Sequence, residues 1–259
     1  MIKLPRTLHI EGSRFPQDSY YRKADPEAIQ FPRLAGEFLV IEEKVDGTGV
    51  SLFFDEKLEL QIWHRGSPAI GEEFFNLRNW AKRHENELLG LLEDRFILFG
   101  EWMLNKHTIF YDQLPHYFLE SDVYDKLGTM WLSTPARNSL LIGHNYIKQV
   151  SMLAAFQPTS LHQIVSLVGK PLYQSKEWRE SMWQQCDMSG LKLDEVLAQT
   201  DQSDLAEGLY IKHEDDRHVI DRYKYVRYQF VETIVNSGSH IRDRVPMHNV
   251  ALGGYGCLL

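Results

Sequence analysis

Short apolar runs separated by polar or glycine-rich turns recur along the chain and predict β-strands. In FLVIEEKVDGTGVSLFF, the runs Phe38–Ile41 and Val50–Phe54 each have the composition of a buried strand. We expect these two strands to pair as a hairpin across the polar turn between them. Three further strands are predicted, namely LELQIWHRG (58–66), RFILFGEW (95–102) and HYFLESDVYD (116–125).

A different spacing predicts helices. From Glu72 to Leu92, apolar residues recur at steps of three and four, which is typical of one amphipathic helix. Residues 159–200 predict three short helices, interrupted at residues 169–171 and 189–190 by glycine, proline and serine. A last helix is predicted over Tyr228–Asn236.

The later part of the chain predicts a second hairpin. EGLYIKHED (207–215) and HVIDRYKYVR (218–227) are two strands that turn at residues 215–216. Residues 1–36 contain several prolines and follow no regular period, so we expect a loop-rich extension there. No internal repeat or low-complexity linker divides the chain. We therefore expect one α+β domain over residues 1–259, with antiparallel sheets flanked by helices.

Composition adds limits to this picture. The chain has 259 residues, of which 43% are hydrophobic and 25% are charged, as in ordinary soluble globular proteins. It has no apolar run of about 18 residues or more and no secretory leader, so we expect a soluble cytoplasmic protein without membrane contacts. Cys186 and Cys257 lie far apart and predict neither a disulfide framework nor a zinc site. A net charge of −8 argues against bulk electrostatic coating of nucleic acid, but not against a local basic patch.

Several predicted strands carry ionisable side chains where burial is expected. These are Lys44, Glu101, Asp122, Glu207, Lys212 and Lys224. Any one of them is explained by the alternation of side chains along a strand, because every second residue of a half-exposed strand faces water. The whole set favours a cavity lined by carboxylates and lysines, which is what a polyphosphate with a divalent metal requires. Arg222 and Lys224 project together, so we expect them to lower the pKa of Lys44 by repulsion and make it nucleophilic.

EKVDGTG resembles the KxDG signature of covalent nucleotidyltransferases, the superfamily of ATP-dependent ligases and mRNA capping enzymes. Further matches follow in the order of that superfamily: RG at 65–66, LFGEW at 98–102, HYFLESDVYD at 116–125, EGLYIK at 207–212 and RYKYVR at 222–227. PRTLHIEGS, KHTIFYDQLPHYFLE and SGSH are similar to segments of stand-alone bacterial RNA ligases. The resemblance covers nearly the whole chain. It implies an RNA ligase with a single nucleotidyltransferase domain of antiparallel sheets flanked by helices, similar to the ATP-grasp and ligase catalytic folds.

The resemblance implies a reaction in three steps that uses ATP and Mg²⁺ or Mn²⁺. Lys44 attacks the α-phosphate of ATP, releases pyrophosphate and retains AMP as a phosphoramidate. AMP then passes to the 5′-phosphate of an RNA end. A 3′-hydroxyl finally attacks this activated end, which seals the strand and releases AMP.

The same resemblance implies roles for residues around the nucleotide. Glu43 helps to fix the adenine, mostly through its backbone, while Asp46 and Gly47 shape the turn after the nucleophile. Glu101 binds the ribose hydroxyls, as a carboxylate that only accepts hydrogen bonds does well. Arg65 contacts the nucleotide or the RNA end.

Other implied roles concern the phosphates and the metal ion. Glu207 holds Mg²⁺ through water, and Glu101 is a second candidate metal ligand. Lys212 and Lys224 contact the α-phosphate. Arg222 occupies the basic position two residues before Lys224, where many relatives have a lysine. Arginine keeps the positive charge there but is bulkier and does not donate a proton as an acid.

One position departs from the family's pattern. Ser121 stands where the family has an aromatic residue that stacks on the adenine. Stacking of this kind contributes ~1–3 kcal/mol, so we expect a weaker affinity for the nucleotide. Tyr210 shares a strand face with Lys212 and is expected to cover the base from the other side.

Two other hypotheses compete with an RNA ligase. One is a DNA ligase or a GTP-dependent capping-type enzyme, although roughly 30 residues after Arg227, in the short helical tail 228–259, are too few for the OB domain of such enzymes. The other is a non-catalytic relative that only binds RNA ends. The expected partner is RNA with 5′-phosphate and 3′-hydroxyl ends, and an end-healing kinase or phosphatase is a further expected partner.

Overall fold

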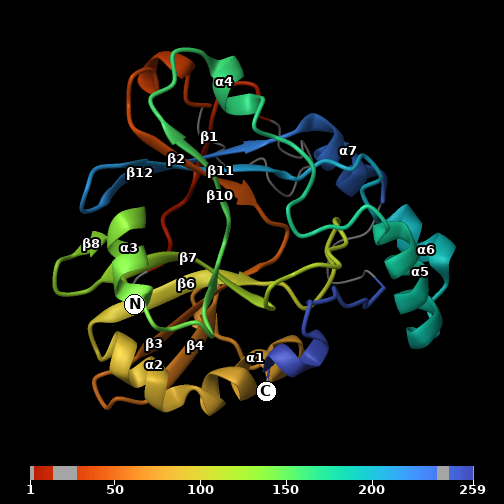
Figure 1. The fold of residues 1–259 in the computed structure, drawn as a ribbon, viewed down its shortest axis with the longest axis horizontal. Coiled ribbons are helices and arrows are strands. Elements are labelled where there is room, and N and C mark those ends of the chain that lie inside the picture. Colours follow the sequence, from red (N-terminus) through yellow and green to blue (C-terminus); the bar gives the residue numbers. More distant parts are fainter. Residues whose placement is uncertain (1–2, 14–27, 238–244, 259) are drawn as a thin grey trace.

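Two β-sheets form the framework of the protein, one above the other in the view of Figure 1. The structure is a computed structural model that describes residues 3–13, 28–237 and 245–258. Part of the expected loop-rich extension (14–27) and the end of the SGSH segment (238–240) lie outside the described residues.

The first sheet has the strand order β1-β12-β11-β2-β10. Its strands are β1 (Leu8–His9), β2 (Leu39–Lys44), β10 (Met152–Phe156), β11 (Gly208–Glu214) and β12 (Val219–Val226). Neighbouring strands are antiparallel, except that β1 runs parallel to β12. The predicted second hairpin is confirmed as β11 and β12.

The second sheet has the strand order β5-β4-β3-β6-β7-β8, and β9 pairs with β7. Its strands are β3 (Thr48–Phe54), β4 (Leu60–His64), β5 (Ser67–Pro68), β6 (Phe96–Trp102), β7 (Phe118–Asp125), β8 (Met130–Trp131) and β9 (Lys148–Gln149). These pairs are antiparallel except for β7 with β9. The expected α+β class with antiparallel sheets is therefore confirmed.

The predicted pairing of the first two long strands is wrong. β2 pairs with β11 and β10, whereas β3 pairs with β4 and β6 in the other sheet. Residues 45–47 thus form a crossover between the sheets instead of a hairpin turn. Alternation indicates which face of a strand is buried, but it does not identify the neighbouring strand. The crossover is also held from outside, because the Asp46 carboxylate accepts hydrogen bonds from the amides of Thr108 and Ile109.

Helices cover the outer faces of the sheets and one side of the molecule (Figure 1). They are α1 (Phe75–Arg83), α2 (Glu85–Leu92), α3 (Thr134–Leu141), α4 (Leu161–Val165), α5 (Trp178–Ser189), α6 (Leu193–Ala198) and α7 (Tyr228–Asn236), with 3₁₀ turns at Phe31–Arg33, Glu72–Phe74 and Gly254–Leu258. The three short helices and the last helix that the sequence predicts are confirmed as α4 to α7. Within the described ranges, no helix is both long and apolar enough to cross a lipid bilayer.

The helix expected from Glu72 to Leu92 is divided at His84. This residue leaves the helical conformation, with φ −94° and ψ 18°. Its ring stacks on Tyr146, with 4.5 Å between the ring centroids and 10° between the planes. The break lets Trp80 of α1 and Leu88 of α2 both bury completely in the core beneath the second sheet.

Alternation along the strands turns the polar side chains of the two sheets toward each other. In the first sheet, Leu39, Ile41, Leu209 and Ile211 pack with Ile164 of α4 in an apolar core. The residues between them, such as Glu42 and Tyr210, therefore face the second sheet. The second sheet packs apolar residues of β3 and β6 against α1 and α2. The cleft between the sheets is consequently lined by polar and ionisable groups.

Candidate active site

Lys44 is the last residue of β2 and lies on the inner side of the first sheet. Its Nζ lies 2.8 Å from Oε1 of Glu207, the residue that precedes β11. The two side chains meet because Lys44 pairs with Gly208 across the strands. On its other side, Gly208 lies close to β12. A Cβ at Gly208 would lie 1.8 Å from the carbonyl oxygen of Tyr225, so only glycine allows β11 to approach β12 this closely.

The electrostatic surroundings of Lys44 differ from the prediction. Burial lowers the pKa of Lys44, but attraction to Glu207, and at longer range to Glu101 and Asp46, raises it above its ordinary value. The expectation that the cations of β12 lower this pKa is therefore wrong, because the carboxylates around the lysine outweigh them. A lysine whose pKa is raised in this way is protonated near neutral pH.

Removing the main counter-ion should make this lysine more reactive. We expect Glu207→Gln to lower the pKa of Lys44 and to raise its rate of acetylation at pH 8 severalfold, because each unit by which the pKa falls increases the neutral amine about tenfold. The measurement is mass spectrometry of the Lys44 peptide after a short pulse of acetic anhydride. Glu85→Gln, which removes an exposed partner of Lys82, is the matched control and should change nothing. Equal reactivity of Lys44 in wild type and Glu207→Gln would contradict the assigned cause.

Asp46 fastens the crossover to the segment that follows β6. Its Oδ2 accepts the N–H groups of Thr108 at 2.6 Å and of Ile109 at 2.9 Å, and its own N–H donates to the Tyr111 hydroxyl at 3.0 Å. Burial raises the pKa of Asp46, but the hydrogen bond and charge of His107 and the two backbone amides lower it to about 2. The placement supports the expected role of Asp46 in shaping the turn.

Gly47 lets the crossover pass close to β6. A Cβ on Gly47 would lie 2.4 Å from Sδ of Met103 and 3.1 Å from Cβ of Glu101. Glu101 is consequently held beside the residues that follow Lys44. Burial raises the pKa of Glu101 to about 7, although Lys44 and His107 pull it down.

Glu43 points away from Lys44, because successive residues of β2 face opposite sides of the sheet. Its Oε2 accepts the N–H of Leu172 at 2.7 Å. Burial raises the pKa of Glu43 to about 7, and the Leu172 amide opposes this rise. The side chain of Glu43 is thus bound on the other face of the sheet, and the backbone role expected for Glu43 stays a prediction.

Three cavities follow one another along the cleft. The Lys44 cavity, of about 190 Å³, is lined by Lys44, Glu43, Glu101, Ser121, Tyr210 and Lys224, with Leu4, Thr7, Glu42, Val45 and Val150. The middle cavity, of about 270 Å³, shares Leu4, Glu101 and Ser121 with it and adds Lys3, Gly49, Val50, Ser51, Trp63, Arg65, Gly66, Phe99 and Gly100. The outer cavity, of about 490 Å³, shares Gly49 and Arg65 with the middle cavity and includes Gly47, Thr48, His64, Lys106 and His107.

Several of the residues singled out in the sequence line the Lys44 cavity. Glu101 reaches it from the second sheet, and Tyr210 and Lys224 reach it from the first. Arg65 lies farther along the cleft, between the middle and outer cavities. It occupies the β4–β5 turn with a φ of 48°, a conformation that few residues other than glycine adopt.

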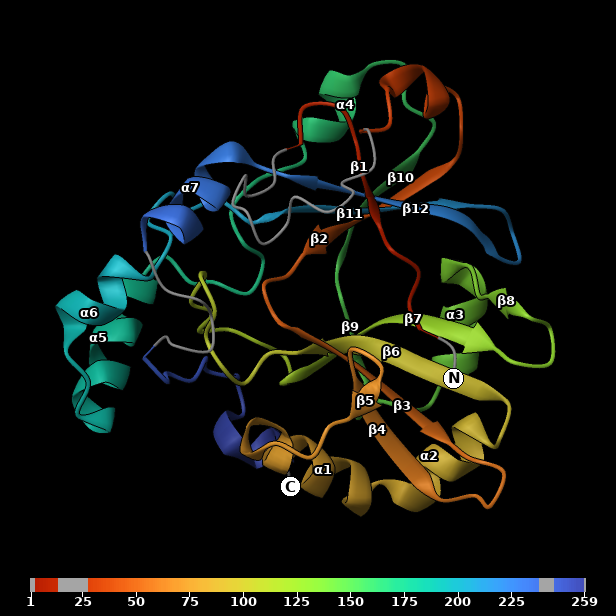
Figure 2. The ribbon, with the colours of Figure 1, turned by 180° about the vertical axis from the view of Figure 1, so that it is seen from behind.

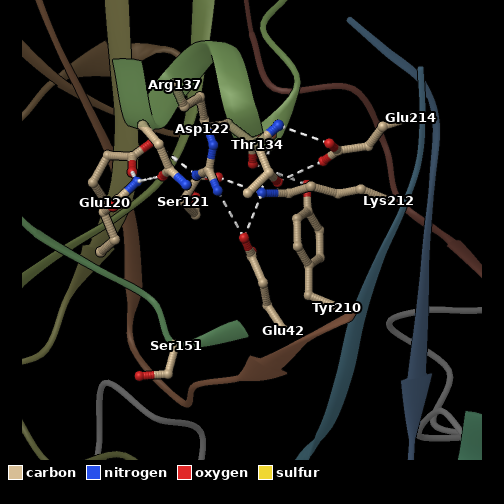
Figure 3. A network of polar contacts seen from close by, with 12 residues as sticks. Glu42, Glu120, Ser121, Asp122, Thr134, Arg137, Ser151, Tyr210, Lys212 and Glu214 are labelled. Carbon is tan, nitrogen blue, oxygen red and sulfur yellow. Dashed lines mark hydrogen bonds and ion pairs between the residues drawn. The ribbon is translucent and has the colours of Figure 1, made fainter. Parts of the chain in front are cut away.

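Two of the predicted phosphate-binding cations, Lys212 and Arg222, lie in a buried polar network, in which Figure 3 labels Lys212. Lys212 is fully buried, and its Nζ donates to Oε1 of Glu42 at 2.9 Å and to the carbonyl of Ser121 at 2.6 Å. Arg222 donates to Asp122 at 2.9 Å. Lys212 lies on the expected strand face, but its ammonium is paired with Glu42 and it is not among the residues that line the Lys44 cavity, so its contact with a phosphate stays a prediction. Arg222 is likewise committed to a buried carboxylate.

Arg137 of α3 lies at the centre of this network (Figure 3). Its Nη2 donates to Glu42 at 2.8 Å, and its Nη1 donates to Glu120 at 2.9 Å and to the carbonyl of Ser121. Glu42 belongs to the first sheet and Glu120 to the second. Arg137 therefore links the two sheets behind the Lys44 cavity.

Sequence reasoning missed α3 and with it Arg137. The segment STPAR does contain a helix-start signal, since Ser133 accepts the N–H of Ala136 and a proline occupies the first turn. The signal could have revealed the helix. It could not have revealed that Arg137 reaches two buried carboxylates, because these come from distant strands.

The carboxylates near Lys44 suit a cation that is only partly coordinated by protein. Among the described residues, no group of three or more His, Cys, Asp or Glu side chains is arranged to hold a metal ion. Glu207 and Glu101 are nevertheless both close enough to raise the pKa of Lys44. Mg²⁺ and similar ions bind through one or two carboxylates and complete their shell with water and phosphate oxygens. The two residues therefore fit a divalent ion that arrives with a phosphate ligand.

Comparisons with known proteins identify the family and the fold of this chain. A family model described as RNA ligase matches residues 37–226. Among solved structures, a Naegleria gruberi RNA ligase mutant with ATP and Mn has a TM-score of 0.54 at 17% identity, covering 91% of this chain and 63% of that one. The same ligase with PPi has a TM-score of 0.53 at 18% identity, and the match covers 89% of this chain and 63% of that one. A mutant with AMP and Mn gives 0.52 at 18% identity, with 87% and 61% coverage.

These solved structures show a shared fold, and this chain spans less than two thirds of their length. No curated protein matches the chain.

Proposed function

Because this chain belongs to the RNA ligase family, we propose that it is an ATP-dependent RNA ligase that carries AMP on Lys44. The observation that carries this proposal is the placement of the Lys44 amine, 2.8 Å from Glu207 in a cavity that also contains Glu101 and Lys224. The similar Naegleria gruberi structures contain ATP, AMP and Mn. Their contents support ATP and Mg²⁺ or Mn²⁺ as cofactors of this chain.

In the first step, Nζ of Lys44 forms a bond to the α-phosphorus of ATP while the bond to the β-phosphate oxygen breaks and pyrophosphate leaves. The amine must first lose a proton, and the nearby carboxylates oppose this loss. A divalent ion held by Glu207 and Glu101 would supply positive charge that favours the neutral amine and offsets the phosphate charge. Lys224, on the wall of the same cavity, is placed to neutralise the α-phosphate.

The remaining walls of the Lys44 cavity position the nucleoside. Glu101 is placed to accept hydrogen bonds from the ribose hydroxyls. Tyr210 presents its ring to the cavity, and its hydroxyl is fixed by donation to Asp122 at 3.2 Å. A ring held in this way offers a rigid surface for the base.

The second and third steps use the RNA ends. An oxygen of the RNA 5′-phosphate attacks the AMP phosphorus, and the bond to Lys44 breaks. The RNA 3′-oxygen then attacks the RNA 5′-phosphorus, its proton is released, and AMP leaves. Arg65, at the turn between the middle and outer cavities, is placed to bind the RNA end.

Ser121 determines how firmly the base is held. Its side chain lines both the Lys44 cavity and the middle cavity, so an aromatic ring at this position has space to enter the cleft. We expect Ser121→Phe to tighten ATP binding by about 1–3 kcal/mol through stacking. Calorimetry in EDTA measures the affinity, with Ser121→Ala as a control that should match wild type. Unchanged or weaker binding by Ser121→Phe would refute the assigned position of the base.

The proposed activity is tested by labelling. The protein is incubated with Mg²⁺ and α-labelled ATP or GTP, and label on the protein is then chased with 5′-phosphorylated RNA or DNA. Label from ATP that moves to RNA supports the proposal. Label from GTP alone would identify a capping-type enzyme, and transfer only to DNA would identify a DNA ligase. Absence of label with both nucleotides would leave a non-catalytic relative that binds RNA ends.

The proposal extends to the setting of the reaction. Residues 1–259 would act as a single nucleotidyltransferase domain in the cytoplasm. Its substrate is RNA with a 5′-phosphate and a 3′-hydroxyl. Because broken RNA often carries other end groups, a kinase or phosphatase that heals the ends is the class of partner that would supply this substrate.

A further inference from the structure

The segment Lys3–Thr7, here called the N-terminal arm, crosses the cleft between the two sheets. It leads into β1, where Leu8 and His9 pair with Tyr223 and Lys224 of β12. The N–H of Ile10 donates to the carbonyl of Lys224 at 3.0 Å. In Figure 2 the red chain before β1 descends from the first sheet to the second. The arm is therefore anchored beside a residue of the Lys44 cavity.

Three residues of the arm line the cavities that it crosses. Thr7 lines the Lys44 cavity, Leu4 lines both the Lys44 and the middle cavity, and Lys3 lines the middle cavity. Lys3 also lies against the β4–β5 turn, because a Cβ built on Gly66 would come within 2.6 Å of its Nζ. The arm thus forms an outer wall that spans both cavities.

The middle cavity is suited to a phosphate group. Lys3 and Arg65 contribute two cations, and Glu101 is the one carboxylate among its described lining residues. One cation comes from the arm and the other from the β4–β5 turn, and the two segments lie against each other at Gly66. Arg65 is exposed and belongs to a turn in which both central residues have positive φ, 48° for Arg65 and 86° for Gly66.

From these contacts we propose that the N-terminal arm is part of the substrate-binding site, and that Lys3 and Arg65 together bind a phosphate group in the middle cavity. The inference rests on the proposed function for the identity of the ligands. Two sources supply the same chemistry, the outer phosphates of ATP and the 5′-phosphate of RNA. Either would lie next to the α-phosphate, since the middle cavity adjoins the Lys44 cavity through Glu101 and Leu4.

The test is equilibrium binding in EDTA, where no bond is made or broken. Wild type, Lys3→Glu and Lys3→Arg are titrated with ATP, with AMP, and with one RNA oligonucleotide carrying either a 5′-phosphate or a 5′-hydroxyl. We expect Lys3→Glu to weaken binding of ATP or of the phosphorylated RNA about tenfold or more, as loss of a charged hydrogen bond does. Lys3→Arg should stay close to wild type.

The pattern of losses identifies the source of the phosphate. Weaker binding of ATP with unchanged binding of AMP assigns the site to the outer phosphates of ATP. Weaker binding of the RNA with a 5′-phosphate, but not of the RNA with a 5′-hydroxyl, assigns it to the RNA end. Lys57→Glu, which changes a lysine at the exposed β3–β4 turn, controls for net charge.

Affinities of Lys3→Glu within twofold of wild type, or equal losses in Lys57→Glu, would overturn the inference. So would a wild type that binds neither ATP nor the phosphorylated RNA. A wild type that binds these ligands through Lys3 but takes no label would refute the ligase and leave the phosphate site standing.

Discussion

Lys44→Ala protein is expected to take no label from α-labelled ATP and to join no RNA ends with 5′-phosphates. The reason is chemical, because a methyl group cannot form the phosphoramidate that the first step requires. The loss should be complete, since the described part of the Lys44 cavity offers Lys224 as its other amine, and that lysine lies on a different strand. Labelled protein on a denaturing gel measures the first step, and joined RNA measures the whole reaction.

A second substrate separates loss of chemistry from loss of folding. RNA that already carries AMP on its 5′-phosphate needs only the last step, in which Lys44 forms no bond. Lys44→Ala should therefore still join this RNA, whereas an unfolded protein would not. Lys57→Ala, at the exposed β3–β4 turn, is the matched control and should take label at the wild-type rate. Label on Lys44→Ala at a comparable rate would place the nucleophile elsewhere.

Arg137→Ala is expected to destabilise the protein by about 3–5 kcal/mol, because it leaves the buried Glu120 without its ion-pair partner and leaves Glu42 paired only with Lys212. Arg137 and its partners Glu42 and Glu120 are each at most 2% exposed. Water cannot replace the guanidinium in such surroundings. The free energy of unfolding in urea measures the effect.

The matched control for this prediction is Arg95→Ala. Arg95 also makes an arginine–carboxylate pair, with Asp125 at 2.7 Å, but its side chain is 42% exposed. A pair of this kind contributes about 0–1 kcal/mol, since water screens it. Similar losses of unfolding free energy in Arg137→Ala and Arg95→Ala would show that burial does not increase the contribution of the Arg137 network to stability. Recovery of stability when Glu42→Gln and Glu120→Gln are added to Arg137→Ala would support the assigned cause.

Much of the fold follows from local patterns in the sequence. The second hairpin was predictable because two alternating segments flank a short polar turn at residues 215–216. The first hairpin was not, because the same signals surround a crossover between two sheets. β10 (Met152–Phe156) escaped prediction for a related reason, since a short strand with little alternation gains its identity from pairing with β2.

The candidate site was predictable where a backbone position decides the outcome. Lys44 pairs with Gly208, a glycine that has no room for a side chain beside Tyr225, and Glu207 directly precedes this glycine. Lys212 shows where such reasoning ends. Its position on the inner face is as expected, but its long side chain ends at Glu42 instead of in the cavity. The direction in which the pKa of Lys44 shifts was not predictable either, because it depends on how close carboxylates from distant segments of the chain lie to the ammonium group.

The crossover at residues 45–47 has a consequence for the mechanics of the site. Lys44 and Glu207 both belong to the first sheet, so their separation is insensitive to a displacement of one sheet against the other. Glu101 belongs to the second sheet, and its distance from Lys44 changes with any such displacement. Resistance to shear across the cleft is supplied in part by Arg137, which is bonded to both sheets. The alignment of Lys44 with Glu101 therefore depends on the stiffness of a contact that is not part of the lining of the Lys44 cavity.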